Sequence, residues 1–302
     1  MFVGLTTLDV VHQVDAPPAV NQKVTASAQV IAAGGPATNA AVTFSGLGGD
    51  AVLVTALGQG AVAEVIRSDL QACRIRIIDV ASEQVDRAAV SSITVVRSTA
   101  ERAVVSLDAG TPEVTDVPDL SSVLAGGDVV LIDGHHPSLA EAASRAAKAA
   151  SIPLVIDAGR WKPVLAQVLP GAQTVICSAD FRYEATGDSD SSARALVRLG
   201  VPTVMVTHGA DPVRWWRGDQ SGSVKPPAVH AVDTSGAGDM FHGAYCYFAV
   251  QTGHADVVGS IQAACEIAST KCRFLGTRSW LRHLADPTTI TASSGDAAYQ
   301  QK

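Results

Sequence analysis

The sequence has no run of 18 apolar residues, no block of five or six like charges and no excess of basic residues. Without such an apolar run, no transmembrane helix is predicted. The net charge of -7 argues against nucleic-acid binding through a basic surface. An anionic substrate would therefore need local devices such as helix N-termini, a few cations or a metal ion.

The sequence also lacks closely spaced cysteine motifs and the composition of a disordered chain. The five cysteines are odd in number and show neither CxxC nor Cys/His ligand spacing, so we expect reduced thiols in a cytoplasmic protein. The N-terminal residues have no basic start, and Asp9 interrupts their short apolar run, which predicts no secretory signal. Hydrophobic residues make up 47% of the 302 residues, which excludes a disordered chain.

Short apolar runs alternate with Ala-rich helical stretches along the chain. Continuous apolar strands separated by helices are typical of a parallel sheet covered on both faces. We therefore predict an open α/β fold with a mostly parallel sheet, in which ligands bind at the carboxyl ends of the strands. The expected strands span residues 51–57, 128–133, 152–158, 172–178 and 201–209.

Two β-rich segments, residues 10–33 and 85–107, have no helix between their expected strands. We predict that they form one small antiparallel sheet, which would serve as a lid over the site or as a dimerisation surface. The alternative is an edge extension of the main sheet. Residues 1–290 are then one domain, and residues 291–302 are expected to be a disordered tail.

The strongest chemical signal is the segment VDTSGAGDMFHGAY at residues 232–245. Gly236, Ala237 and Gly238 form a small-residue turn that leads into a helix, where free N–H groups and the helix dipole favour an anion. Asp239 follows at the position of a carboxylate facing that anion, where it could accept a proton from an attacking hydroxyl. The alternative is an N-capping Asp after an ordinary glycine turn.

DTSGAGD resembles the C-terminal signature of the ribokinase-like (PfkB-type) carbohydrate kinases. A second segment, AAGGPATNAAVTFSGLGG at residues 32–49, resembles the family's Gly-Gly motif, which is followed by a polar residue four positions later. The opening VGLTTLDVV is similar to the family's first strand with an Asp at its end. The resemblance covers about residues 1–285.

This resemblance implies ATP-dependent transfer of a phosphoryl group to an alcohol, usually a sugar hydroxymethyl group. Asp239 would be the base, and the amides of Gly236, Ala237 and Gly238 would form the anion hole. The Walker pattern is absent, so a P-loop would not hold the phosphates. Mg²⁺ would bind through ATP oxygens and water, with no protein ligand assigned.

The resemblance also implies an acceptor site built from Asp9, Gly34, Gly35 and Asn39. A carboxylate can accept from two hydroxyls, and an amide can both donate and accept. His135, after the strand at 128–133, is a further candidate for contact with the acceptor. The alternatives are a strand-end Asp that caps a turn, a helix-surface Asn and a surface histidine.

On the nucleotide side the resemblance points to Thr207, Gly209 and Ala264. Ser178 stands where many members have the Asn of an Asn-x-x-Glu motif, which is absent here. A monovalent cation such as K⁺ would bind near Asp233, with backbone oxygens supplied by the chain around residue 276.

We therefore predict a cytoplasmic sugar kinase that forms a homodimer through the lid and binds neither nucleic acid nor membrane. One alternative acceptor is a phosphosugar or acidic sugar, held by cations such as Arg97, Arg102, Arg160 or Lys162. Another is a nucleoside, although no aromatic residue lies between 45 and 160 to stack on a base. The remaining alternative is a binding protein that has lost catalysis.

Overall fold

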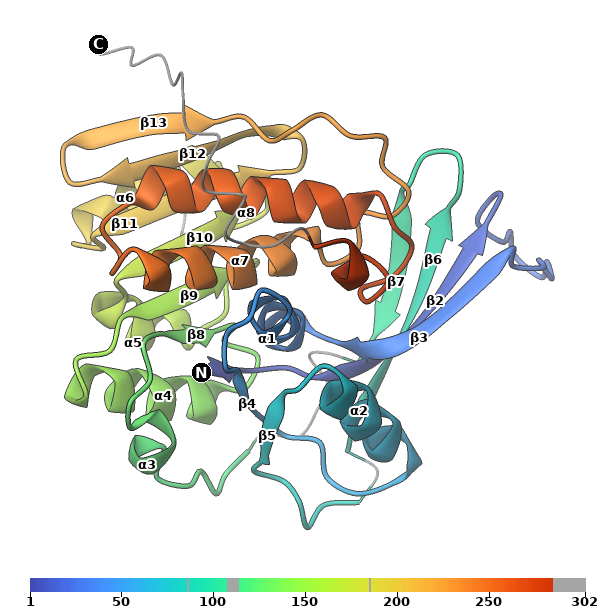
Figure 1. The fold of residues 1–302 in the computed structure, drawn as a ribbon, viewed down its shortest axis with the longest axis horizontal. Coiled ribbons are helices and arrows are strands. Elements are labelled where there is room, and N and C mark those ends of the chain that lie inside the picture. Colours follow the sequence, from blue (N-terminus) through green and yellow to red (C-terminus); the bar gives the residue numbers. More distant parts are fainter. Residues whose placement is uncertain (86, 108–113, 185, 285–302) are drawn as a thin grey trace.

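The computed structural model describes residues 1–85, 87–107, 114–184 and 186–284. Its larger sheet has nine strands, shown in Figure 1. Their spatial order is β13 (Gln220–Val224), β12 (Asp211–Arg217), β11 (Thr203–His208), β10 (Thr174–Ser178), β9 (Leu154–Ala158), β8 (Val130–Ile132), β1 (Phe2–Val3), β4 (Val52–Thr55) and β5 (Arg76–Asp79). Strands β11 to β5 pair in parallel, and β12 and β13 add an antiparallel edge.

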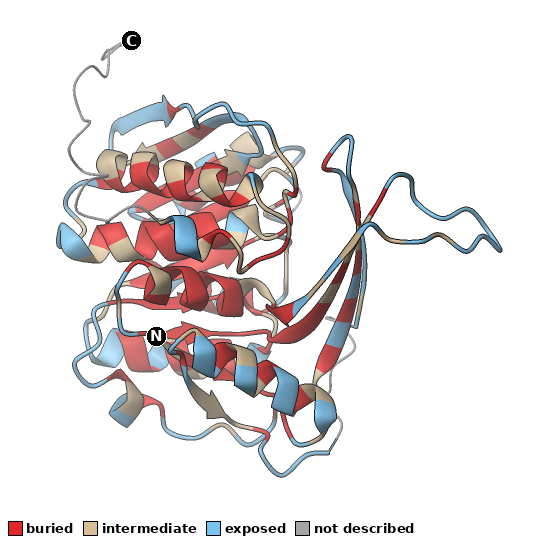
Figure 2. Ribbon diagram, turned by 45° about the vertical axis from the view of Figure 1, so that its right-hand side comes forward, coloured by how far each residue is buried: buried red, intermediate tan, exposed pale blue. Residues whose placement is uncertain are grey.

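Helices cover both faces of this sheet. One face packs on α1 (Pro36–Gly46), α2 (Ala61–Ala72), α7 (Ala237–Gln251) and α8 (Val257–Cys272). The other packs on α3 (Ser121–Leu124), α4 (Pro137–Ala149), α5 (Leu165–Val168) and α6 (Ser189–Arg198). Neighbouring apolar residues of the inner strands alternate between the two cores. Figure 2 shows these inner strands as buried. The predicted α/β class is confirmed, with two short 3₁₀ turns at Leu169–Gly171 and Leu281–His283.

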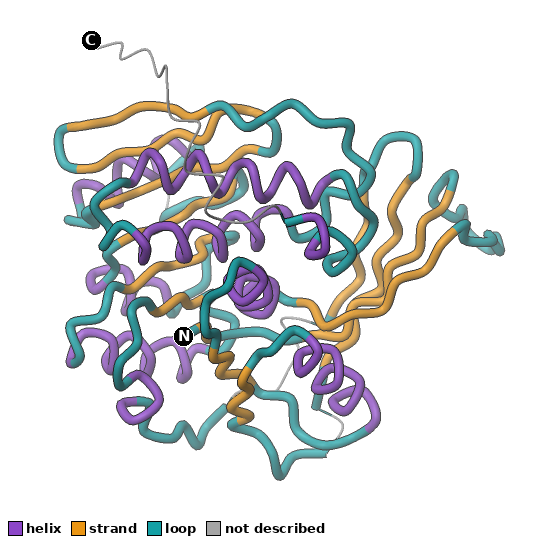
Figure 3. Tube along the Cα trace, in the orientation of Figure 1, coloured by secondary structure: helices purple, strands orange, loops and turns teal. Residues whose placement is uncertain are grey.

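A smaller four-stranded sheet projects from the body, as Figures 1 and 3 show. Its order is β3 (Ala28–Gly34), β2 (Thr7–Val14), β6 (Ala89–Val96) and β7 (Arg102–Ser106). The expectation of a separate sheet made from the two β-rich segments is confirmed, and the alternative of an edge extension is wrong. The outer pairs are antiparallel, but β2 and β6 join the two halves in parallel.

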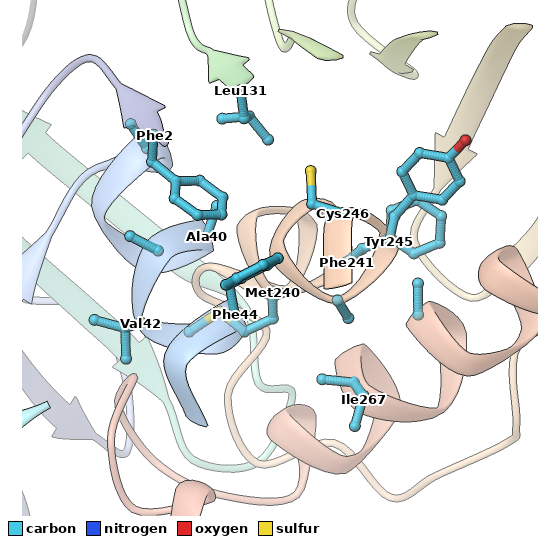
Figure 4. Close-up of a cluster of buried hydrophobic side chains, with 14 of the residues drawn as sticks. Phe2, Ala40, Val42, Phe44, Leu131, Met240, Phe241, Tyr245, Cys246 and Ile267 are labelled. Carbon is cyan, nitrogen blue, oxygen red and sulfur yellow. The ribbon is translucent and has the colours of Figure 1, made fainter. Parts of the chain in front are cut away.

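Helix α1 packs closely against α7, which lies about 200 residues later in the sequence. Gly243 permits this approach, because a Cβ there would lie 2.2 Å from the backbone oxygen of Ala40. The rings of Phe2 and Phe44 meet edge to face at 5.4 Å in the same core. Figure 4 shows side chains that fill this contact, among them Phe2, Ala40, Phe44, Met240, Phe241 and Cys246. The packing fixes the N-terminal turn of α7 beside α1.

The strand expectations missed β5 and the β12–β13 hairpin. β5 carries charged residues at both ends, and β13 is exposed except at Val224. Neither has the continuous apolar run that identifies a buried strand. Among the described residues, no helix is long and apolar enough to cross a membrane. The predicted tail, 291–302, lies outside the described residues.

Candidate active site

The turn before α7 has the geometry of an anion site. Gly236 takes a left-handed conformation, with φ of 71°, which glycine adopts readily. An added Cβ at Gly238 would meet no atom of the described residues within 4 Å, so the backbone there is open to a ligand. The first N–H groups of a helix have no partner within it, and the dipole places positive charge at this end. Gly236, Ala237 and Gly238, which were predicted to form the anion hole, lie at this helix N-terminus.

Asp239, in the first turn of α7, meets Asn39 from α1. The Asn39 amide donates to Asp239 Oδ2 at 2.9 Å, across 200 residues of sequence. Burial, with the negative charge of Asp157 nearby, raises the pKa of Asp239 to about 6, and the hydrogen bond from Asn39 opposes that rise. A carboxylate with this pKa is ionised at neutral pH and still basic enough to accept a proton.

Two residues that the sequence analysis did not single out lie beside Asp239. His242, one helical turn later, places Nδ1 3.0 Å from Asp157 Oδ2, and both side chains are buried. Burial opposes the charged ring, but the carboxylates of Asp157 and Asp239 outweigh it and raise the pKa of His242. Their positions could have identified both residues from the sequence. Asp157 lies near the carboxyl end of β9, and His242 lies one turn after Asp239 on the same helix.

Asp9 lies on β2, in the smaller sheet, rather than at the end of β1 as the sequence suggested. Thr7 Oγ1 donates to Asp9 Oδ1 at 2.7 Å, and burial raises the pKa of this carboxyl. Gly34, in the paired strand, gives the carboxylate room, since a Cβ there would lie 1.9 Å from Asp9 Oδ2. Gly35 has φ of 98°, and a Cβ there would lie 2.3 Å from the Leu5 oxygen. A side chain at Gly34 would therefore collide with the Asp9 carboxylate, and one at Gly35 with the backbone of Leu5.

Asn39 has one polar atom free for a ligand. The residue is 2% exposed, its amide nitrogen donates to Asp239, and among the described residues its buried Oδ1 has no hydrogen-bond partner. A buried acceptor left unpaired destabilises the protein by about 1 to 3 kcal/mol, so this atom is suited to receive a ligand hydroxyl.

His135 is half-buried after β8, and its backbone N–H donates to Asp133 Oδ1 at 2.9 Å. Positive charge on His135 is the smallest of the causes that lower the pKa of Asp157. The neighbouring His136 is buried, and burial lowers its pKa to about 4, so this ring is neutral at pH 7.

The residues expected on the nucleotide side separate into two groups. Ser178 ends β10 and pairs with Thr207, the residue before the end of the adjacent strand β11, and Gly209 follows β11 at φ of 55°. Ser178 Oγ donates to the Gly159 oxygen at 2.6 Å. Ala264, on α8, has no exposed surface and packs in the core, so the structure offers adenine no direct contact there.

Residues 1–283 match the pfkB family carbohydrate kinase pattern. The chain belongs to this family. A putative ribokinase from Agrobacterium tumefaciens aligns over 93% of this chain and 96% of its own, at 24% identity and a TM-score of 0.76. A ribokinase from Giardia lamblia aligns over 96% and 98%, at 19% identity and a TM-score of 0.79. These two likenesses concern the fold.

A deoxyribokinase from Salmonella typhi is 38% identical over 89 residues. The match spans 30% of this chain and 28% of that relative. The family and the fold together make this protein a carbohydrate kinase.

Arg97 and Arg102, two of the four cations considered for an acidic acceptor, have protein partners. Arg97 pairs with Asp15 at 2.6 Å, just beyond the ends of β6 and β2, the two central strands of the smaller sheet, and both side chains are exposed. Arg102, from β7, donates to Thr234 Oγ1 at 3.0 Å and so ties the smaller sheet to the turn before α7. Arg160 is exposed and Lys162 half-buried, both after β9.

The donor set can be compared with the needs of Mg²⁺. Carboxylate oxygens of Asp157 and Asp239 and a ring nitrogen of His242 lie within 4.8 Å of one another. Mg²⁺ prefers oxygen ligands and keeps much of its water shell. The two carboxylates fit such an ion through water, whereas His242 is better suited to balancing their charge.

Proposed function

We propose that this protein transfers the γ-phosphoryl group of ATP to a primary hydroxyl of a small sugar. The observation that carries the proposal is the contact between Asn39 and Asp239. It places a carboxylate with a pKa of about 6 beside an open glycine turn at a helix N-terminus. Phosphoryl transfer needs mainly positioning and charge stabilisation, and this arrangement offers both.

Asp239 would accept the proton of the attacking sugar hydroxyl. The hydroxyl oxygen would bond to the γ-phosphorus while the bond from that phosphorus to the leaving ADP oxygen breaks. The N–H groups of Gly236, Ala237 and Gly238 would hold the phosphoryl oxygens as charge builds up. The positive ring of His242, which pairs with Asp157, would favour the ionised form of Asp239 and so oppose the rise in its pKa that burial and Asp157 cause. Mg²⁺, bound with ATP, would neutralise phosphate charge.

The acceptor would bind between α1 and the smaller sheet. Asp9 would accept hydrogen bonds from sugar hydroxyls, and the unpaired Oδ1 of Asn39 would accept another. An alcohol bound there would lie close to Asp239, because Asn39 donates to Asp239 and would accept from the alcohol. The local similarity to a deoxyribokinase makes pentoses the first acceptors to test.

A neutral sugar fits better than the two alternative acceptors. Arg97 and Arg102 already have protein partners, so they are less suited to bind an acidic substituent. None of the smaller sheet's strands contains an aromatic side chain to stack on a nucleoside base.

The smaller sheet would also join two copies of the chain in a homodimer. Its strands and flanking residues expose large apolar side chains, with Val105 76% exposed and Ile31 51% exposed. Exposed apolar clusters of this kind are typical of interaction surfaces. A second copy would cover them and close the lid region.

The test is ADP release with Mg-ATP against pentoses, hexoses, phosphosugars and nucleosides, with Asp239→Ala as the control. We expect one neutral sugar to support turnover in the wild type and none in the variant. Turnover of the variant within about tenfold of wild type would refute the assignment of Asp239 as base, since a positioned base contributes more than that.

A further inference from the structure

Lys271, in the last turn of α8, is a fully buried cation with no role in the chemistry proposed above. Its side chain has no exposed surface, and Nζ donates to the backbone oxygen of Asp233 at 2.8 Å. Nζ also lies 3.3 Å from Asp233 Oδ2, whose residue is equally buried. Burial lowers the pKa of Lys271, and the charge of Asp233 opposes that effect. Removing one partner of such a pair leaves an uncompensated buried charge.

Asp233 links Lys271 to the turn that forms the anion site. Asp233 Oδ1 accepts from the Ser235 N–H at 2.8 Å, directly before Gly236. Asp233 Oδ2 accepts from the Gly276 N–H at 2.8 Å, and the Asp233 N–H donates to the Cys272 oxygen at 3.2 Å. The ammonium group thus holds a carboxylate that fixes the start of the turn and the chain after α8.

This is where the family resemblance places a monovalent cation, near Asp233 and residue 276. The donor set does not fit a free ion here. The ion was expected beside Asp233, but the backbone oxygen and the carboxylate of Asp233 already face Nζ of Lys271. A second positive charge beside a buried ammonium would be repelled in this low-dielectric interior.

We propose that Lys271 is a built-in cation that replaces a bound monovalent ion behind the anion-binding turn, so that activity is independent of K⁺. Lys271 is a positioning residue, because it acts on the turn through Asp233 and touches neither substrate nor ATP. The activity arm of the test rests on the proposed kinase function, whereas the stability arm does not.

The first measurement uses the wild-type protein. ADP release with the accepted sugar is compared in KCl, NaCl and tetramethylammonium chloride at equal ionic strength, because exposed charges are screened by salt. We expect equal rates in the three salts. A wild type that loses about tenfold or more without K⁺ would overturn the proposal.

The second measurement uses Lys271→Ala, which opens a space for a cation, with Lys148→Ala as the matched control on an exposed lysine in the last turn of α4. Without K⁺ or NH₄⁺, we expect Lys271→Ala to lose about a hundredfold in turnover, as a displaced turn would cause. K⁺ or NH₄⁺, but not tetramethylammonium, should restore a large part of it. The control should respond to none of these ions.

Thermal unfolding without substrates separates this proposal from the proposed function. We expect K⁺ to raise the melting temperature of Lys271→Ala by about 3 °C or more over tetramethylammonium, because a ligand of the folded state stabilises it. The wild type should show no such difference. If Lys271→Ala has the same turnover and the same melting temperature in K⁺, NH₄⁺ and tetramethylammonium, then Lys271 only fills space and the proposal is overturned. Lys271→Ser, which also leaves space for a cation, replaces the alanine variant if that does not fold.

Discussion

Replacing Asp239 with Asn should make the folded protein more stable at pH 8. The pKa of Asp239 rises from 3.8 to about 6 in the folded state, chiefly because the carboxylate is buried. Holding the charged form there costs about 3 kcal/mol at pH 8, at about 1.4 kcal/mol for each tenfold change in proton affinity. An asparagine side chain is close in size to aspartate, carries no charge and can still accept the hydrogen bond from the Asn39 amide. We therefore expect Asp239→Asn to gain about 1 to 3 kcal/mol.

The sign of the pH dependence follows from the raised pKa. The folded state binds this proton more tightly than the unfolded chain, so wild-type stability falls as the pH rises from about 4 to about 6. Urea unfolding at pH 8 and at pH 4.5 measures both effects. The advantage of Asp239→Asn should be largest at pH 8 and small at pH 4.5. A variant that is less stable than wild type at pH 8 would refute the reasoning.

Three further substitutions test the surroundings of this carboxylate and the smaller sheet. His242→Gln removes the positive ring that lowers the pKa of Asp239, so the acid limb of the pH–rate profile should move above about pH 6, and an unchanged limb would contradict this. Gly34→Ala would place a Cβ 1.9 Å from Asp9 Oδ2 and should raise the sugar KM about tenfold or more, as measured by ADP release, while ATP affinity stays constant. Val105→Glu puts a charge on an exposed apolar position of β7, and sedimentation should show that the predicted dimer becomes a monomer, whereas an unchanged dimer would exclude this surface.

The sequence predicted the α/β class because the buried strands are short apolar runs and the helices between them are Ala-rich. β9, β10 and β11 fall inside the expected ranges for this reason. The β12–β13 hairpin was not predicted, because it lies at the edge of the sheet and lacks a continuous apolar run.

The glycine turn and Asp239 were recognisable because a small-residue turn before a helix carries its chemistry in local sequence. Contacts between segments far apart in the sequence could not be recognised in this way. Asp157, His242 and Lys271 acquire their roles only when β9, α7 and α8 pack together, and no local spacing marks a buried lysine as the partner of Asp233. Asp9 was recognised as a candidate but placed on the wrong strand, because β1 ends at Val3 and the chain passes directly into the smaller sheet.

The most direct test of the central claim separates ATP binding from chemistry at Asp239. ATP affinity is measured by calorimetry, and the product by phosphorus NMR with the accepted sugar, for wild type and Asp239→Asn. The account predicts similar ATP affinity in both proteins, a new phosphate ester with the wild type, and a rate about 10² to 10⁴-fold lower with the variant. Ester formation by Asp239→Asn at a rate close to that of the wild type would contradict it.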